Sequence, residues 1–419
     1  MSEITPLSGL KILCASQNYY GHAIPVSRLA LRLRESGHQV FMASPEGNND
    51  SIDRLCGLYD IPTMRVPSTS PTDFLPAMPI IEDFRPDVTL NDGAPGLWMA
   101  FKAWRPPCQI AIYRFEQFLG YERRNLFLPD QPSMEPGHLL NRINAQRTQL
   151  RLPAASSEME LWKADIVVVP GVPQFDPLPQ KMLEACPNTT FVYTGPLLSP
   201  EAEEIPAALQ EWLTLNRSRG TPIVLITLGT LWGASVYRKL VDCFAAGEFA
   251  VVMVVPQERQ RRELEKVDQP WLRVSAFTGL LGLARCVDLI IHHGGHGTLS
   301  VALLAGKPSL TLPCGEYDRE DNALRLEDLD CGRHLGHDFF RHGIHRRAMI
   351  QAMTDILGRS DIRRGVEGMS RVMNHYVQTR GAGALEEALT RHFTKAAVQE
   401  EFRNNYDVGS YLGQHTVDR

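Results

Sequence analysis

The chain has 419 residues, of which 43% are hydrophobic and 22% are charged. These proportions are typical of a globular protein and exclude a disordered or collagen-like chain. Lys and Arg total 43 against 48 for Asp and Glu, and the formal net charge of −5 argues against a broad nucleic-acid-binding surface. At about 150 residues per domain, the length predicts two or three domains.

The N-terminus and the apolar runs indicate a cytoplasmic protein without stable membrane insertion. MSEITPLSGLK has no basic start and no long apolar core, so we expect no signal peptide. The longest apolar runs, such as 249–255, are far shorter than the ~18 residues of a membrane span. The eight cysteines form no Cys-x-x-Cys pair, which favours reduced thiols.

Strands and helices alternate in the first half of the chain. KILCAS (11–16) predicts a buried strand, QNYYGH a loop, and apolar residues at helical spacing a helix over about 24–35. HQVFMAS predicts the next strand, and such a strand–helix–strand unit implies a parallel sheet. Further strands are expected at 87–90, 109–113, 165–169 and 190–194.

The middle of the chain contains an insertion and a linker. Residues 113–152 are rich in aromatics, Arg and Pro, and predict loops and short helices that can line a pocket at the strand ends. The stretch 195–209 carries three Pro and three Glu, which is typical of a linker between domains. A second α/β unit follows, with strands expected at 222–227, 250–255, 272–274, 287–292 and 309–312.

The most informative segment is VDLIIHHGGHGTLSVALLAGKPSLTLP (287–313). It predicts a buried strand, a glycine-rich turn, a short helix over 298–305 and another strand. The glycines let the backbone turn sharply and approach a ligand, while the helix start offers free N–H groups and a positive dipole end. This indicates a phosphate site, to which His293 can add a hydrogen bond or a positive charge. A glycine-rich turn without a ligand remains the alternative.

The run from 292 to 332, HHGGHGTLSVALLAGKPSLTLPCGEYDREDNALRLEDLDCG, resembles the donor-binding signature of GT-B glycosyltransferases of inverting family 1. GHAIPVSRLALRLRESGHQV (21–40) is similar to the start of the same family. YTGPLL and IVLITLGT resemble its linker and the first strand of its second domain. The positions that match the C-terminal signature include Gly306, Pro308, Pro313, Asp318, Asn322, Ala323 and Arg325.

The resemblance implies an α/β GT-B fold, with two Rossmann-like domains whose parallel sheets face a central cleft. We expect an acceptor domain over 1–195, a linker over 196–215, a nucleotide-sugar domain over 216–380, and a helix and tail over 381–419 that pack back on the first domain. The implied activity is inverting transfer of a sugar from a dTDP- or UDP-sugar to a hydroxyl of a small lipophilic natural product, without a metal or cofactor.

By resemblance, His22 is the general base and Asp92 its partner. An acceptor hydroxyl is a weak nucleophile until it loses its proton, and an imidazole with an ordinary pKa of about 6.5 can accept that proton. A carboxylate fixes the imidazole tautomer and stabilises the imidazolium. The local sequence alone favours a structural interpretation, in which His22 is a helix-start residue and Asp92 a turn residue.

The resemblance also assigns residues to the sugar nucleotide, and the local sequence offers candidates for the acceptor. The donor residues are Gly229, Thr230, His293, Gly294, Gly295, His296, Gly297, Thr298, Asp318, Arg319 and Asn322. The aromatic side chains of Tyr113, Phe115, Phe118 and Tyr121 form either core or acceptor pocket.

Several positions depart from the family pattern. Val301 stands where many UDP-hexose enzymes have a ribose-binding Glu, and Arg319 replaces a Gln, where it contacts a donor or pairs with Glu316 or Glu320. FTGLLGL (277–283) has no clear base-contacting Pro-Gln. His334, His337, His342 and His345 fit no standard zinc spacing. A sugar-nucleotide epimerase of the same fold and a non-catalytic sugar-nucleotide-binding protein remain alternatives.

Overall fold

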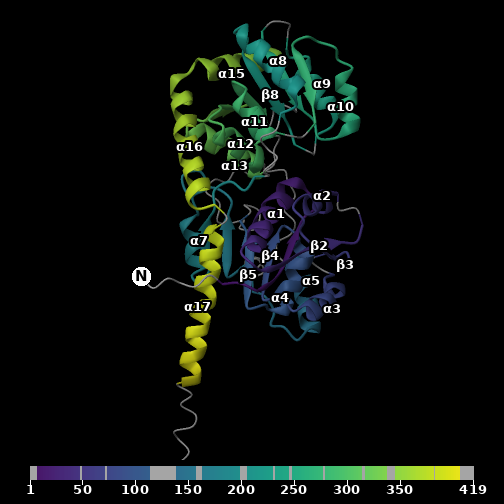
Figure 1. The fold of residues 1–419 in the computed structure, drawn as a ribbon, viewed down its shortest axis with the longest axis vertical. Coiled ribbons are helices and arrows are strands. Elements are labelled where there is room, and N and C mark those ends of the chain that lie inside the picture. The colour runs from purple at the N-terminus through teal and green to yellow at the C-terminus, as the bar shows by residue number, and fades with distance from the viewer. Residues whose placement is uncertain are drawn as a thin grey trace, which may run out of the picture.

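Figure 1 shows the computed structural model of the chain. The structure describes residues 7–47, 50–70, 73–113, 138–156, 163–198, 205–229, 232–244, 248–276, 279–313, 317–336, 345–381 and 383–405. Within them two α/β domains follow one another, each built on a parallel sheet. The predicted α/β class with two parallel sheets is therefore confirmed.

The first sheet has seven parallel strands in the order β3-β2-β1-β4-β5-β6-β7. Their bounds are β1 Lys11–Ser16, β2 Gln39–Pro45, β3 Thr63–Val66, β4 Val88–Asp92, β5 Cys108–Ile112, β6 Ile166–Val169 and β7 Thr190–Tyr193. The helices of this part are α1 Tyr20–Glu35, α2 Asp50–Leu58, η1 Leu75–Ala77, α3 Met78–Phe84, α4 Pro95–Trp104, α5 His138–Gln149 and α7 Gln180–Ala185.

Hydrophobic layers cover both faces of the first sheet. Successive side chains of a strand point to opposite faces, so Ile12 and Cys14 pack with α1 while Leu13 and Ala15 pack with α4. Strands buried on both faces are near-continuous apolar runs, and this is why the sequence shows them so clearly.

The second sheet has six parallel strands in the order β10-β9-β8-β11-β12-β13. Their bounds are β8 Ile223–Thr227, β9 Ala250–Val254, β10 Leu272–Ser275, β11 Leu289–His292, β12 Ser309–Thr311 and β13 Gly332–His334. The helices here are α8 Ala207–Ser218, α9 Ala234–Val241, α10 Glu258–Glu265, α11 Leu280–Arg285, α12 His296–Leu304, α13 Tyr317–Asp328, α15 Arg346–Gly358, α16 Ser360–Thr379 and α17 Gly383–Asn405.

The last two helices tie the domains together along one side of the molecule (Figure 1). Met369 and Met373 of α16 belong to a core cluster of the second domain. Leu385 and Leu389 of α17 belong to a core cluster of the first domain. The chain thus returns to the first domain after completing the second.

The sequence placed some boundaries wrongly. Helix α1 begins at Tyr20 and not at about residue 24, so the segment expected as a loop already forms its first turn. Helix α12 begins at His296, two residues before the expected start. Helix α8 lies largely inside the expected linker 196–215, because Trp212 and Leu213 pack into the second domain. The short outer strands β3 and β13 were not predicted.

No helix among the described residues is both long and apolar enough to cross a membrane.

Candidate active site

Each sheet has one point at which the strand order reverses, and the predicted functional residues lie at these two points. In the first sheet β1 lies beside β4, with Ser16 paired to Asp92. In the second sheet β8 lies beside β11, with Thr227 paired to His292. The loops that follow two such neighbouring strands run in opposite directions, which opens a crevice at the carboxyl ends of the strands. This crevice is where α/β proteins usually bind ligands.

The structure brings His22 and Asp92 together at the first reversal point. Nδ1 of His22 lies 2.9 Å from Oδ1 of Asp92. The Asp92 side chain is fully buried, whereas that of His22 is 26% exposed. Because Asp92 occupies Nδ1, the other ring nitrogen, Nε2, is left to meet a substrate. The pair expected from the sequence therefore has the geometry of an oriented general base.

Gly93 is a site residue that the sequence reasoning missed. Its φ of +66° lies in the left-handed region, and a Cβ at this position would lie 2.9 Å from Nδ1 of His22. A side chain at this position would therefore require the imidazole or the backbone to shift. The signal was present in the sequence as a glycine directly after the strand-terminal carboxylate.

Most of the expected acceptor residues lie outside the described part of the chain. This applies to Phe115, Phe118 and Tyr121. Tyr113 is half-buried and packs against the core cluster that also holds Trp98. Its backbone N–H donates to the carbonyl of Val168 at 2.7 Å, which fixes the end of β5 beside β6.

The His293 ring lies between two glycines at the second reversal point. A Cβ on Gly229, whose φ is +71°, would lie 2.9 Å from its Cε1, and a Cβ on Gly295 would lie 2.5 Å from its Nε2. Since Gly295 is the N-cap of α12, the imidazole faces the start of that helix. The ring and the free helix N–H groups together form a site suited to a phosphate group.

Burial sets the charge of the two adjacent histidines. Desolvation lowers the pKa of His292 to about 3. Desolvation, followed by the positive charge of Arg319, lowers the pKa of His293 to about 3. In the free protein at neutral pH, His293 is thus an uncharged hydrogen-bonding group. The sequence left open whether His293 contributes a hydrogen bond or a positive charge, and its neutral state favours the hydrogen bond.

The turn before α12 is held from both sides by side chains. The N–H of Gly294 donates to Nδ1 of His292 at 3.1 Å. The carboxamide of Asn322, which is buried, donates through Nδ2 to the carbonyl of Gly294 at 2.8 Å. Asn322 was expected to contact the donor, but its amide nitrogen stabilises the turn. The backbone of Arg319 leaves no space for a side chain at residue 294, where a Cβ would lie 2.7 Å from its carbonyl oxygen.

His296 contacts the first domain through its side chain. Its Nε2 lies 3.3 Å from Oδ2 of the buried Asp176, which follows β6. Nη1 of Arg325 donates to Oδ1 of the same carboxylate at 2.8 Å, and Nη2 of Arg325 pairs with Asp321. Burial alone would raise the pKa of Asp176, but His296 and Arg325 outweigh it and hold the pKa at about 2. A charged contact thus joins the two domains beside the start of α12.

The remaining expected donor residues border the same turn. Gly297 and Thr298 lie in the first turn of α12, and Asp318 and Arg319 lie in the first turn of α13. Thr230 and Glu316, one of the expected partners of Arg319, are outside the described residues. Val301 points into a core cluster, so the departure from the family pattern fills the interior with an apolar side chain.

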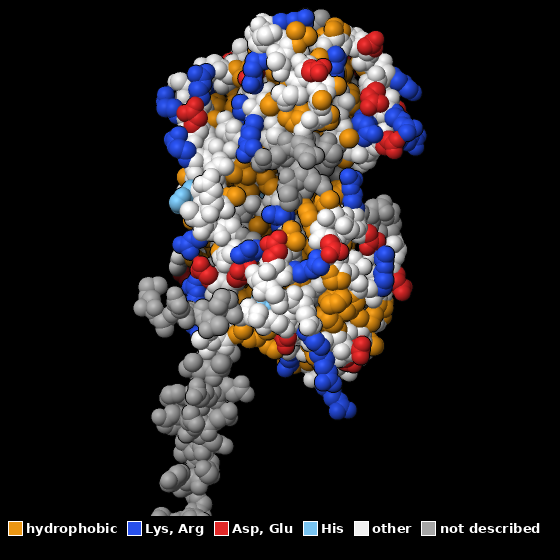
Figure 2. Space-filling model, viewed as in Figure 1, with side chains coloured by type: hydrophobic (Ala, Val, Ile, Leu, Met, Phe, Trp, Pro, Cys, Tyr) orange, Lys and Arg blue, Asp and Glu red, His pale blue; other side chains and the backbone are white. Residues whose placement is uncertain are grey.

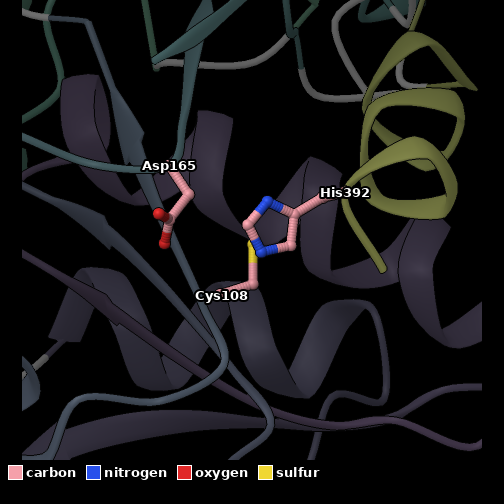
Figure 3. A group of neighbouring side chains, drawn as sticks. All are labelled: Cys108, Asp165 and His392. Carbon is pink, nitrogen blue, oxygen red and sulfur yellow. The ribbon is translucent and has the colours of Figure 1, made fainter. Parts of the chain in front are cut away.

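One group of metal-ligating residue types gathers away from this site. Figure 3 shows Cys108, Asp165 and His392, whose ligand atoms lie within 4.8 Å of one another. Nε2 of His392 lies 3.0 Å from the carbonyl of Pro107, and Oδ2 of Asp165 accepts from the N–H of Gln109 at 2.8 Å. Burial raises the pKa of the Cys108 thiol. These contacts attach α17 to the start of β5.

Of the four histidines weighed as zinc ligands, His334 and His345 are described. His334 contacts Glu327 through Nδ1, and His345 is the N-cap residue of α15. His337 and His342 lie outside the described residues.

Comparisons with known proteins place the chain among glycosyltransferases. Residues 238–374 match the family model of the erythromycin biosynthesis protein CIII-like C-terminal domain. The chain is 23% identical to the NDP-glycosyltransferase YjiC of Bacillus subtilis, over 88% of this chain and 93% of that one. It is 24% identical to the demethyllactenocin mycarosyltransferase of Streptomyces fradiae, over 74% of this chain and 72% of that one.

Among solved structures, the calicheamicin glycosyltransferase CalG4 superimposes with a TM-score of 0.70 at 16% identity, covering 93% of this chain and all of that one. This likeness confirms the expected GT-B fold.

Proposed function

Because the chain belongs to the superfamily of family 1, antibiotic-type GT-B glycosyltransferases, we propose that it transfers a sugar from a dTDP- or UDP-sugar to a hydroxyl of a small lipophilic natural product. Its relatives' acceptors differ, so the proposal names a class of acceptor. The observation that carries the proposal is the His22–Asp92 contact of 2.9 Å at the reversal point of the first sheet.

His22 is the proposed base. Asp92 accepts the hydrogen of Nδ1, which leaves the lone pair of Nε2 to take the proton from an acceptor hydroxyl as that oxygen attacks the anomeric carbon. The buried carboxylate then stabilises the imidazolium that forms. A positioned base of this kind contributes roughly 10² to 10⁴ to the rate.

The leaving nucleoside diphosphate gains negative charge as the bond to the sugar breaks. The first turn of α12 and the His293 imidazole form the proposed site for this charge, through backbone N–H groups, the positive end of the helix dipole and a ring nitrogen. These groups can stabilise the leaving group without a metal ion, and we propose a metal-independent reaction.

We propose a single displacement, which inverts the anomeric carbon. A double displacement would need a carboxylate free to attack the sugar. Asp92 is the carboxylate beside His22, and it is fully buried and held by the imidazole. It is therefore placed to orient the base and not to act as a nucleophile.

The base assignment is tested by substituting His22 and a matched control residue. We expect His22→Ala to lower the transfer rate by roughly a hundredfold or more, because the hydroxyl loses its base, with an unchanged affinity for the nucleoside diphosphate. His375→Ala changes an exposed histidine on α16 and should behave as the wild-type protein. Normal turnover of His22→Ala would exclude His22 as the base.

The donor and the stereochemistry need separate measurements. A thermal-shift screen of UDP- and dTDP-sugars identifies the donor before any acceptor is known, because a ligand that binds the folded protein raises its unfolding temperature. The anomeric configuration of the product, measured by proton NMR, then tests inversion. Retention of configuration would contradict the single displacement.

A further inference from the structure

A cavity lies at the junction of the two domains. Its volume is about 610 Å³, and α1 of the first domain and α11, α12 and α16 of the second contribute to its wall, together with residues 196–198. Figure 2 shows a hollow in this region, beside the ridge formed by α16. The volume falls within the range of roughly 300–1,000 Å³ that is usual for small-molecule sites.

The cavity is separate from the catalytic pair. Leu31 lines it and lies nine residues after His22 on α1, which is two and a half turns of a helix at about 3.6 residues per turn. Leu31 and His22 therefore lie on opposite faces of α1.

The cavity is also separate from the proposed phosphate site. Leu304 lines it at the last residue of α12, whereas the phosphate site lies at the first. The two ends of this helix are about 12 Å apart at about 1.5 Å per residue.

The polar part of the wall is strongly basic. Among the residues that the structure describes, four arginines line the cavity against one carboxylate, that of Glu35; the arginines are Arg28, Arg32, Arg285 and Arg380. Arg32 pairs with Glu386 at 3.0 Å and with Glu35 at 3.7 Å.

Two of these arginines have no counterion in the described part of the chain. The guanidinium groups of Arg28 and Arg380 form no ion pair or side-chain hydrogen bond with any residue that the structure describes. Arg28 is half-buried and lines the cavity, so its guanidinium is placed to pair with an anion that enters.

The rest of the wall is apolar. Leu197, Leu198 and Leu281 contribute to it, as does Val377, whose side chain is 43% exposed. An exposed valine beside leucines and unpaired guanidinium groups matches a ligand with an apolar body and an anionic head.

We propose that this cavity binds a small amphipathic anion, namely an apolar chain or ring system that carries one phosphate or carboxylate group. The guanidinium of Arg28 receives the head group, since its planar fork matches both anions, and the apolar wall receives the body. A molecule bound here touches both domains, and it therefore stabilises their observed arrangement by its binding free energy.

The test measures binding by calorimetry on the intact chain. The probes are monododecyl phosphate and dodecanoate, each below the concentration at which it aggregates. Dodecyl maltoside is the neutral amphiphile, and inorganic phosphate is the head group alone. We expect at least one of the two anionic amphiphiles to bind about tenfold more tightly than either control and to raise the unfolding temperature. The tighter of the two identifies the head group.

Substitutions locate the site. Arg28→Gln should weaken the preferred anion about tenfold, and Val377→Asp should weaken it similarly by placing a charge in the apolar wall. Arg54→Gln removes an exposed arginine of α2 and should bind as the wild type does. Equal binding of dodecyl maltoside, unchanged affinity of Arg28→Gln, or a fall in unfolding temperature with the anion would each overturn the proposal.

Discussion

Replacing Gly93 by alanine tests whether the catalytic pair depends on a residue without a side chain. The left-handed φ of +66° costs an alanine about 1–2 kcal/mol. Part of this is offset, by about 0.4–1 kcal/mol, because alanine restricts the unfolded chain. The backbone conformation alone therefore predicts a loss of about 1 kcal/mol in the free energy of unfolding.

The effect on activity should be much larger than the effect on stability. The new Cβ would lie 2.9 Å from Nδ1 of His22, so something must shift, and we expect the imidazole to lose its hydrogen bond with Asp92. Loss of an oriented base lowers the rate by about a hundredfold or more, which corresponds to about 2.7 kcal/mol in the activation free energy. Affinity for the nucleoside diphosphate should not change, because its proposed site lies on the other sheet.

Gly9→Ala is the matched control in the same domain. Gly9 has a φ of +79°, and a Cβ there would meet nothing within 4 Å. Urea unfolding should show destabilisation of both variants, with the larger loss for Gly93→Ala because the buried Asp92 also loses its contact with His22, while initial rates under donor saturation should fall for Gly93→Ala alone. Equal rates for the two variants would refute the argument that the bare Cα of Gly93 keeps His22 in place.

Substitutions at three further residues probe the second domain and its contact with the first. Asn322→Ala should raise the KM for the donor roughly tenfold in steady-state kinetics. The reason is that the buried carbonyl of Gly294 loses its hydrogen bond, at a cost of about 1–3 kcal/mol. An unchanged KM would contradict this expectation. At pH 7, His293→Gln should bind nucleoside diphosphate with an affinity within about threefold of the wild type, whereas His293→Ala should lose about tenfold in affinity, both measured by calorimetry. The reason is that the imidazole is a neutral hydrogen-bond donor, which a glutamine amide can replace. Equal losses of affinity in the two variants would show that the charge of the imidazole matters. Because the pKa of Asp176 is lower in the folded protein than in the unfolded chain, its carboxylate stabilises the fold at pH values above about 4, the ordinary pKa of an aspartate. This stabilisation is lost as the pH falls towards about 2. Urea unfolding measured from pH 5 to pH 2 should therefore show a loss of about 2 kcal/mol in the free energy of unfolding, and Asp176→Asn should lack this loss.

The sequence predicted the central strands because burial on both faces leaves a continuous apolar run. β1 was predicted with its observed bounds, Lys11–Ser16. The outer strands were missed because they lack this signal. β3 is TMRV, with one fully buried residue, and β13 is the three-residue segment GRH. Their position is set by pairing with a neighbouring strand, which no local pattern records.

The sequence named the residues that lie at the two reversal points, but it did not show which residues they contact. The family motif named His22 and Asp92, and the structure joins them across 70 positions of the chain. It also named Asn322 and His296, but a motif gives no direction to a side chain. The Asp176–Arg325 contact, between residues 149 positions apart, could not be predicted because nothing local marks Asp176 as a partner.

The position of His296 couples the two domains to the proposed donor site. Its side chain contacts Asp176 of the first domain, while its backbone belongs to the first turn of α12, where we propose that the diphosphate binds. Because one turn of helix carries both contacts, a diphosphate at α12 changes the electrostatic surroundings of the His296–Asp176 pair. By linkage, the domain contact must change the affinity for the diphosphate to the same extent. If the diphosphate binds at α12 as we propose, the arrangement of the domains and the affinity for the donor both depend on His296.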